Sequence, residues 1–254
     1  MSFIIYISTF GKKVKKVAHG RPIEVGAACR DHFLYELKDN TGDNISAENP
    51  YYAELTGLYW VWKNVKNKPD DIIGFCHFNK SLLIDPVKAN DLIRKKGYRF
   101  IVCRHQAIPQ MVYPEDYKAL LSIVRDKHPK YYRALYELYG QDGSSSKCNG
   151  KNTFITTRKD FDKYCTFLFD VLGECRRVIG AVEERPTQRY VALLAERLLS
   201  VYLKTENISY YEADIEYDRP LLTVSKAIIN RLPFSGNSPL LYKLRKQFAK
   251  SSYH

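Results

Sequence analysis

Polar and charged side chains follow directly after three short apolar segments of the chain, where they could bind a phosphorylated ligand. If the apolar segments are parallel strands, their carboxyl ends meet at one edge of a sheet, and open α/β sheets bind ligands at that edge. The alternative is that polar residues merely mark the ends of buried strands. The residues concerned are Ser8 and Thr9, His77, Asn79 and Lys80, and Arg104.

Two segments carry carboxylates that could take up a proton as a general base. Asp43 lies in the segment 39–46, whose Asp, Asn, Thr and Ser side chains could bind sugar hydroxyls or fold into an Asx-turn. Glu196 and Arg197 interrupt an otherwise apolar helical segment, and charges there are rarely buried unless they are paired. They therefore form a structural ion pair or point into a cleft, where Arg197 could clamp phosphate and Glu196 could act as the base.

The segment 51–66 has apolar residues at helical spacing, interrupted by residues of a different kind. Glu54 falls on the apolar side of this helix, where a partly buried carboxylate needs a partner or a function. Trp62 matches the apolar stripe, whereas Trp60 points elsewhere. Packing in the core accounts for most of the aromatic residues here, which leaves Glu54 and Trp60 as candidates for ligand contacts.

Short apolar segments alternate with segments of helical periodicity through the first hundred residues. This alternation predicts an α/β fold, with a mostly parallel sheet flanked by helices and a helical C-terminal part. Residues 12–49 are expected to form a loop. The expected strands are residues 3–8, 72–76, 98–103 and 152–157, with 208–213 as a further candidate. The expected helices are residues 51–66, 87–96, 131–139, 160–179 and 187–204, with another beginning at Pro114.

The composition shows a basic chain with enough apolar residues for a core. It has 254 residues, 45% of them hydrophobic, and its 40 Lys and Arg against 28 Asp and Glu give a net charge of +12. Disorder as the default state is thereby excluded. The length fits one large domain, which we expect at residues 1–218. The positive charge favours nucleotide phosphates, an anionic membrane surface or nucleic acid as partner.

Residues 219–254 carry lysine and arginine interleaved with apolar residues and contain no Asp or Glu. This pattern suits either an amphipathic helix at a membrane surface or a helix docked on the domain with its basic face in water. No apolar segment of the sequence is long enough to span a bilayer, and the N-terminus lacks the basic start of a signal peptide. We therefore expect a cytoplasmic protein which, if the tail does bind a membrane, is peripheral on the inner face of the cell membrane.

Several common motifs for phosphate and metal binding are absent from the sequence. It has no G-x-G-x-x-G fingerprint, no P-loop, no G-x-S-x-G elbow and no H-E-x-x-H helix. Its six cysteines form no C-x-x-C pair, which argues against a thiolate zinc site and fits a reducing cytoplasm. No D-x-D triplet follows the second expected strand. The sequence thus allows a divalent metal but assigns no ligand to it, so the cofactor is left undefined.

Three longer strings resemble one family of bacterial glycosyltransferases. They are Thr-Gly-Asp-Asn-Ile-Ser at 41–46, Glu-Leu-Thr-Gly-Leu-Tyr-Trp at 54–60 and Ile-Gly-Phe-Cys-His-Phe at 73–78. The family occurs in loci for capsule, exopolysaccharide and O-antigen synthesis and includes galactofuranosyltransferases. The resemblance covers most of the chain up to Ala213. Where the family usually has Arg-Arg after the second strand, this chain has Asn79 and Lys80.

The resemblance implies a GT-A-like fold that transfers a sugar, such as galactofuranose, from a UDP-sugar to a lipid-linked oligosaccharide during synthesis of a surface polysaccharide. The basic tail would then bind anionic lipids of the inner leaflet. Under this hypothesis the donor contacts Ser8, Thr9, His77, Asn79, Lys80, Arg104 and Arg197. The acceptor contacts Glu54, Trp60 and Asn152, and the candidate bases are Asp43 and Glu196.

Two other classes of function remain as alternatives. A nucleic-acid-binding protein would explain the charge and would bind with a steep dependence on salt. However, the basic residues concentrate near the two ends, and no nucleic-acid motif is present, so we expect no nucleic-acid partner. The second alternative is a catalytically inactive scaffold of the same fold, which the altered Asn79-Lys80 pair and the missing D-x-D triplet suggest.

Overall fold

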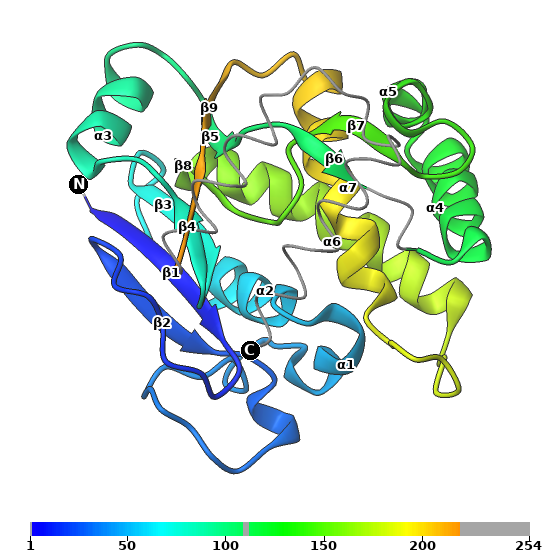
Figure 1. The fold of residues 1–254 in the computed structure, drawn as a ribbon, viewed down its shortest axis with the longest axis horizontal. Coiled ribbons are helices and arrows are strands. Elements are labelled where there is room, and N and C mark those ends of the chain that lie inside the picture. Colours follow the sequence, from blue (N-terminus) through cyan, green and yellow to red (C-terminus); the bar gives the residue numbers. More distant parts are fainter. Residues whose placement is uncertain (1, 109–111, 219–254) are drawn as a thin grey trace.

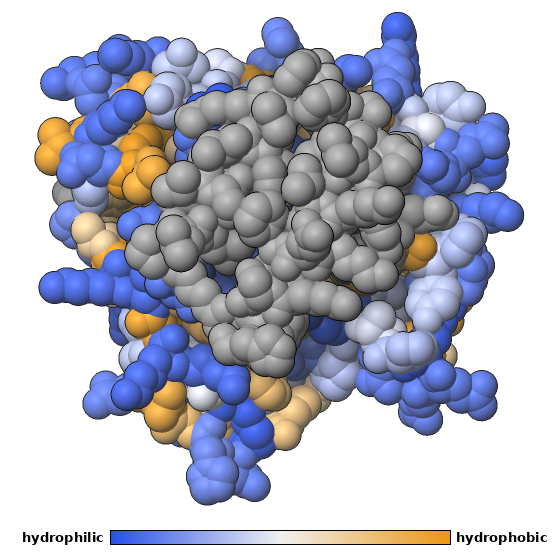
Figure 2. Space-filling model, viewed as in Figure 1, coloured by the Kyte–Doolittle hydropathy of each residue, from blue (hydrophilic) through white to orange (hydrophobic). Residues whose placement is uncertain are grey.

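The computed structural model describes residues 2–108 and 112–218, which form a central sheet with helices packed on both of its faces (Figure 1). The predicted α/β class, with a central sheet flanked by helices, is confirmed, and the sheet contains both parallel and antiparallel strand pairs. The predicted basic tail, residues 219–254, lies outside the described residues, so the domain boundary at 218 stays a prediction. In the described part of the chain, no helix combines the length and hydrophobicity needed to cross a membrane. The described surface visible in Figure 2 is mainly hydrophilic, with smaller apolar areas between.

The body of the sheet has the strand order β2–β1–β3–β8–β5–β9. Strand β1 runs parallel to both β2 and β3, and β5 runs parallel to β9. Strand β8 is antiparallel to both of its neighbours, β3 and β5. The bounds are Phe3–Thr9 (β1), Gly20–Glu24 (β2), Ile72–His77 (β3), Phe100–Cys103 (β5), Phe154–Thr157 (β8) and Tyr210–Ala213 (β9). The further strand expected near 208–213 is therefore present as β9.

Short strands that were not expected from the sequence extend this sheet and add a second one. Lys80–Leu82 (β4) turns back from the end of β3, and Ile215–Tyr217 (β10) pairs with it antiparallel. Gln106–Ile108 (β6) and Ser145–Cys148 (β7) form a separate antiparallel pair. These segments lie close to the carboxyl ends of β3 and β5, so they build the surroundings of the sheet edge rather than its core.

The helices are divided between the two faces of the sheet. Helix α3 packs on one face with Ile5, Ile7, Ile101 and the other apolar side chains that point that way. The remaining helices share a larger core with the alternate side chains of the same strands, such as Tyr6 and Phe100. The helices are Asn49–Tyr52 (α1), Leu55–Asn64 (α2), Pro86–Arg94 (α3), Pro114–Lys127 (α4), Pro129–Tyr139 (α5), Arg158–Ile179 (α6) and Tyr190–Thr205 (α7), with single 3₁₀ turns at Ala27–Cys29 and Ser46–Glu48.

The register of the parallel strands brings their carboxyl ends together. Ser8 lies opposite His77 across the β1–β3 pair, and Thr9 lies opposite Glu24 across the β1–β2 pair. Adjacent strands are separated by about 4.8 Å. The polar residues that follow β1 and β3 are therefore neighbours at one edge of the sheet.

The polar segment 39–46 is largely a structural element. Asp39 is buried, and its carboxylate accepts hydrogen bonds from the backbone N–H of Gly26 (2.9 Å) and of Ala27 (3.0 Å) and from the hydroxyl of Ser46. The side chain of Asn44 accepts the N–H of Ser46 in an Asx-turn. This segment thus ties the end of β2 to the start of α1, which is the alternative that the sequence left open.

Candidate functional site

A cavity of about 350 Å³ opens at the carboxyl edge of β1 and β3, within the size range of small-ligand sites. Its walls come from the ends of β1 and β3, from the residue after β2, from α1 and the start of α2, and from the residue before α7. The lining residues are Ser8, Thr9, Phe10, Val25, Asn49, Pro50, Ala53, Glu54, His77, Phe78 and Arg189.

Glu54 contributes the carboxylate in this cavity. It precedes α2 and follows Ala53, whose φ of 48° turns the chain sharply between α1 and α2. Its Oε1 accepts a hydrogen bond from Nδ2 of Asn152 (3.0 Å) and lies 3.9 Å from Nε2 of His77, and its Oε2 lies 3.5 Å from Arg189. Burial alone would raise the pKa of Glu54. The amide of Asn152, the charges of Lys80 and Arg189 and, when it is protonated, His77 outweigh this effect, so the net pKa is lowered. The carboxylate is therefore ionised at neutral pH.

His77 is held in its neutral form at the end of β3. Its Nε2 lies 2.7 Å from the backbone carbonyl of Lys151, and a carbonyl can only accept, so Nε2 carries the proton. Burial, together with the nearby charge of Lys80, lowers the pKa of His77 to about 4. The ring thus links the carboxylate of Glu54 to the loop that precedes β8.

Two lysines lie near Glu54 and His77. Lys80 lies opposite His77 in the β3–β4 register, and burial together with repulsion from Lys151 lowers the pKa of Lys80 to about 8. Nζ of Lys151 lies 3.7 Å from Oε1 of Glu196, which raises the pKa of Lys151. An anion bound near the two ammonium groups would relieve their mutual repulsion.

The backbone at Lys151 and Asn152 is in a conformation that residues other than glycine rarely adopt. The φ angles are 84° and 46°, respectively. Only 2% of Asn152 is exposed, and its Oδ1 has no hydrogen-bond partner among the described residues. Backbone strain and unpaired buried polar atoms concentrate at functional sites, where a ligand can supply the missing partner.

Seven of the predicted site residues lie in or beside the cavity. Ser8, Thr9, Glu54 and His77 line it, and Lys80, Asn152 and Glu196 are connected to Glu54 and His77 through the contacts described above. The hydroxyls of the β1 residues are engaged by the backbone, since Ser8 donates to the carbonyl of Cys76 (3.1 Å) and Thr9 donates to that of Lys12 (2.6 Å). Which of these residues touch a ligand stays a prediction.

Asp43 and Trp60 are placed on the outer side of α2 and do not line the cavity. Asp43 is exposed, accepts a hydrogen bond from the hydroxyl of Tyr59 (3.0 Å) and lies 4.0 Å from Lys63. The indole N–H of Trp60 donates to the carbonyl of Thr41 (2.8 Å). Asp43 was expected to act as a base and Trp60 to contact the acceptor. In the structure both are engaged in contacts between α2 and the segment 39–46, so these roles stay predictions that the cavity does not support.

Arg197 likewise does not line the cavity. Only 1% of it is exposed, and its guanidinium donates to the carbonyls of Gly143 and Leu193, both at 2.7 Å. It forms neither the expected ion pair with Glu196 nor a contact with the cavity. Its charge is stabilised by backbone carbonyls inside the helical layer, so we assign it a structural role.

Arg104 and Asn79 lie at the same sheet edge but outside the cavity lining. Arg104 pairs with Asp214 (2.9 Å) and lies 3.8 Å from Glu212 at the end of β9. The backbone carbonyl of Asn79 accepts the N–H of Asp218 (2.9 Å) in the turn between β3 and β4. Arg104 is thus neutralised by its own neighbours, which weakens its expected role in binding a diphosphate.

Among the residues in or beside the cavity that the sequence did not mark as candidates are Phe10, Lys151 and Arg189. Arg189 carried a signal, because it belongs to a Gln-Arg pair in the stretch that resembles the glycosyltransferase family. Lys151 carried none, because its position depends on two successive residues with positive φ. Metal ligands were not assigned from the sequence, and in residues 2–108 and 112–218 no group of three or more His, Cys, Asp or Glu residues could hold a metal ion.

Comparison with known proteins defines the class of the fold and then the family. A solved structure of the WbbM bifunctional glycosyltransferase in its apo form superimposes with a TM-score of 0.72 at 22% identity, over 85% of this chain and 45% of that one. The fold is thus shared with a glycosyltransferase, of which the chain spans less than half the length. The family model "Domain of unknown function (DUF4422)" matches residues 5–108 and 83–207, so the chain belongs to this family. No curated protein matches the sequence significantly.

Proposed function

We propose that the protein is a glycosyltransferase that moves a sugar from a nucleotide-sugar donor to a glycan acceptor. The observation that carries the proposal is the ionised carboxylate of Glu54 in a cavity at the carboxyl edge of the sheet, with Lys80 and Lys151 beside it. The fold shared with WbbM supports the same class of reaction. UDP as the nucleotide, galactofuranose as the sugar and a lipid-linked oligosaccharide as the acceptor are what the resemblance to the bacterial glycosyltransferases implies, and they are part of the proposal.

The arrangement suits displacement at the anomeric carbon of the donor. The acceptor oxygen forms a bond to that carbon while the bond from the carbon to the diphosphate oxygen breaks, and the electron pair leaves with the diphosphate. The proton of the acceptor hydroxyl passes to Glu54, which replaces Asp43 and Glu196 as our candidate base. Lys80 and Lys151 stabilise the charge that develops on the diphosphate.

The proposed cellular setting follows from the basic tail, residues 219–254. Its lysine and arginine residues would attract anionic lipids of the inner leaflet and bring the domain to a lipid-linked acceptor. Binding of the full chain to vesicles with and without an anionic lipid tests this. Binding only to the anionic vesicles, weakened by salt, is the expected result, and equal binding to both would contradict it.

The transferase proposal is tested by incubating the full chain with a panel of UDP-, GDP- and dTDP-sugars and measuring release of the nucleoside diphosphate. We expect saturable binding and slow hydrolysis of one donor. Glu54→Gln should lower turnover by about 100-fold or more while donor binding is retained, because the amide cannot accept the proton. The control Asp43→Asn should stay within a few-fold of the wild type. Binding without turnover would identify an inactive scaffold, and the absence of any binding would refute the proposal.

A further inference from the structure

Phe10 is an aromatic residue that lines the cavity with half of its surface exposed. It follows Thr9 at the end of β1, at the sheet edge where the polar residues gather. A ring this exposed gains little from burial in the domain itself. Its position leaves an aromatic surface open at the cavity wall.

A cation packs against this ring. The guanidinium of Arg30 lies over the ring of Phe10 at 4.7 Å from its centroid and over the ring of Phe33 at 4.9 Å. Arg30 itself is not among the residues that line the cavity. Contacts of this type hold an aromatic ring in place.

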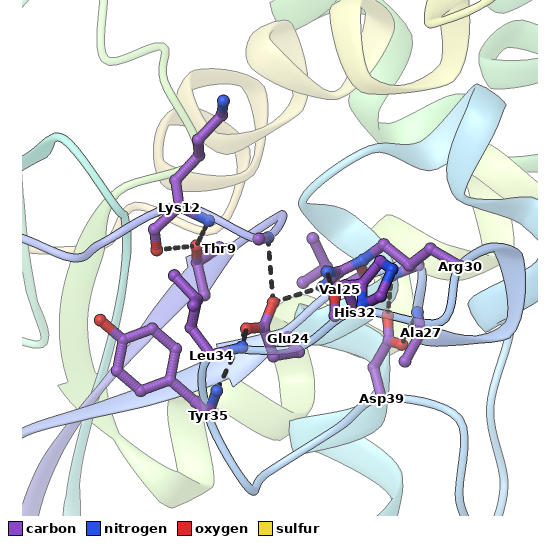
Figure 3. A network of polar contacts seen from close by, with 12 residues as sticks. Thr9, Lys12, Glu24, Val25, Ala27, Arg30, His32, Leu34, Tyr35 and Asp39 are labelled. Atoms are coloured by element: carbon purple, nitrogen blue, oxygen red, sulfur yellow. Dashed lines mark hydrogen bonds and ion pairs between the residues drawn. The ribbon is translucent and has the colours of Figure 1, made fainter.

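Arg30 is in turn fixed by a buried carboxylate, as Figure 3 shows. Glu24 is buried at the end of β2 and pairs with the guanidinium. Its other hydrogen bonds come from the backbone N–H groups of Gly11 (3.1 Å), Leu34 (2.7 Å) and Tyr35 (3.2 Å). Burial alone would raise the pKa of Glu24. These donors and the guanidinium outweigh that effect and lower the pKa overall, so the carboxylate is charged. The buried carboxylate of Glu24 has hydrogen-bond partners at both oxygens, and it holds the guanidinium of Arg30 in place.

The backbone directly after Phe10 is fixed by the same network. Gly11 has a φ of +63°, a conformation that favours glycine, and a Cβ added there would lie 3.1 Å from Nη1 of Arg30. Its N–H donates to Glu24, as described above. Both the ring of Phe10 and the chain that follows it are thus held against Arg30, and the ring is preorganised rather than mobile.

We propose that Phe10 is the platform on which the nucleobase of the donor stacks. The inference rests on the proposed function and deepens it by naming the residue that binds the base. A planar base gains from contact with an aromatic face whatever its hydrogen-bonding pattern. Because β1 and β3 are adjacent, a base on Phe10 leaves the phosphates beside His77 and Lys80, where the positive charge lies.

The test measures binding of UDP, GDP and pyrophosphate to the full chain by isothermal titration calorimetry. Phe10→Ala should weaken binding of the preferred nucleotide by about tenfold or more and leave pyrophosphate unchanged, because only the base loses its partner. Phe10→Tyr should bind like the wild type. Phe33→Ala is the matched control, since it removes the other ring on Arg30 without changing the cavity wall, and its nucleotide affinity should stay within about threefold.

The outcomes separate the two proposals. If the wild type binds a nucleotide and Phe10→Ala binds it equally well, or if the variant loses nucleotide and pyrophosphate to the same extent, the stacking role is refuted and the proposed function stands. If the wild type binds neither nucleotides nor pyrophosphate, the proposed function is refuted, and the stacking role with it. Phe10→Leu guards against misfolding, because it keeps an apolar side chain and should still lose affinity for the nucleotide only.

Discussion

The amide of Asn152 donates a hydrogen bond to the carboxylate of Glu54 over 3.0 Å and so joins two residues that are 98 positions apart. This contact connects the start of α2 to the loop before β8. It aims one oxygen of Glu54 and leaves Oδ1 of Asn152 without a partner among the described residues. The geometry of the candidate base therefore depends on a strained residue in a distant segment.

Replacement of Asn152 by Ala should shift the pH dependence of transfer. Loss of the amide donor removes one of the contacts that lower the pKa of Glu54, so the base becomes protonated at higher pH. We expect the acidic limb of the pH–rate profile to move upward and the maximal rate to change less than in Glu54→Gln. A profile that drops uniformly at every pH would show that Asn152 acts on something other than the base.

Lys80 should make nucleotide binding sensitive to alkaline pH. Because its pKa is about 8, the ammonium is mostly charged at pH 7 and mostly neutral at pH 9. An anionic ligand prefers the charged form, so affinity for UDP should fall by up to about tenfold between these pH values, and binding near pH 8 should take up a proton. Calorimetry in buffers of different ionisation enthalpy measures this uptake. The Lys80→Arg variant should bind UDP with little dependence on pH. If its UDP affinity still falls between pH 7 and pH 9, the ammonium of Lys80 is not the group responsible.

His77 should reduce the stability of the protein in mild acid. Its pKa is lowered to about 4 in the folded state, against about 6.5 in the unfolded chain. Between these values the unfolded state binds the extra proton, so the free energy of unfolding falls as pH falls through this window, by at most about 3 kcal/mol. Urea unfolding of wild type and His77→Asn at pH 7 and pH 4.5 checks the prediction. The variant should lose less stability than the wild type over this interval.

Two aspartates of the segment 39–46 should respond differently to truncation. Asp39→Ala leaves the backbone N–H groups of Gly26 and Ala27 and the hydroxyl of Ser46 without their acceptor. We expect a loss of about 2–4 kcal/mol in the free energy of unfolding. Asp43→Ala, on the exposed surface of the same segment, is the matched control and should change stability by about 0.5 kcal/mol or less. Similar losses for both variants would contradict the structural role of Asp39.

The sequence was sufficient for the class of fold because the apolar segments and the helical periodicity are strong in this chain. It also placed Ser8 and His77 at one edge, since that follows from parallel strands. Strand β2 was missed because Gly20–Glu24 contains Pro22 and few apolar residues, and it pairs within the sheet with β1 alone. Its identity as a strand depends on tertiary pairing that local pattern does not contain.

The roles of charged residues were harder to predict because they depend on partners that are distant in sequence. Arg197 could equally have faced a cleft, and only the fold shows that its guanidinium meets the carbonyl of Gly143. Glu54 was recognised as unusual, but its role in the cavity required the positions of His77 and Asn152. Patterns of residue type identify which charges need a partner, whereas the fold decides what that partner is.

The central claim is that the cavity between β1, β3 and α2 receives the nucleotide-sugar donor. Crystals of the full chain soaked with UDP test it most directly. We expect density for the base against the ring of Phe10 and for the diphosphate beside Lys80 and Lys151. UDP bound elsewhere on the protein, or an empty cavity at a concentration that saturates binding in solution, would contradict it.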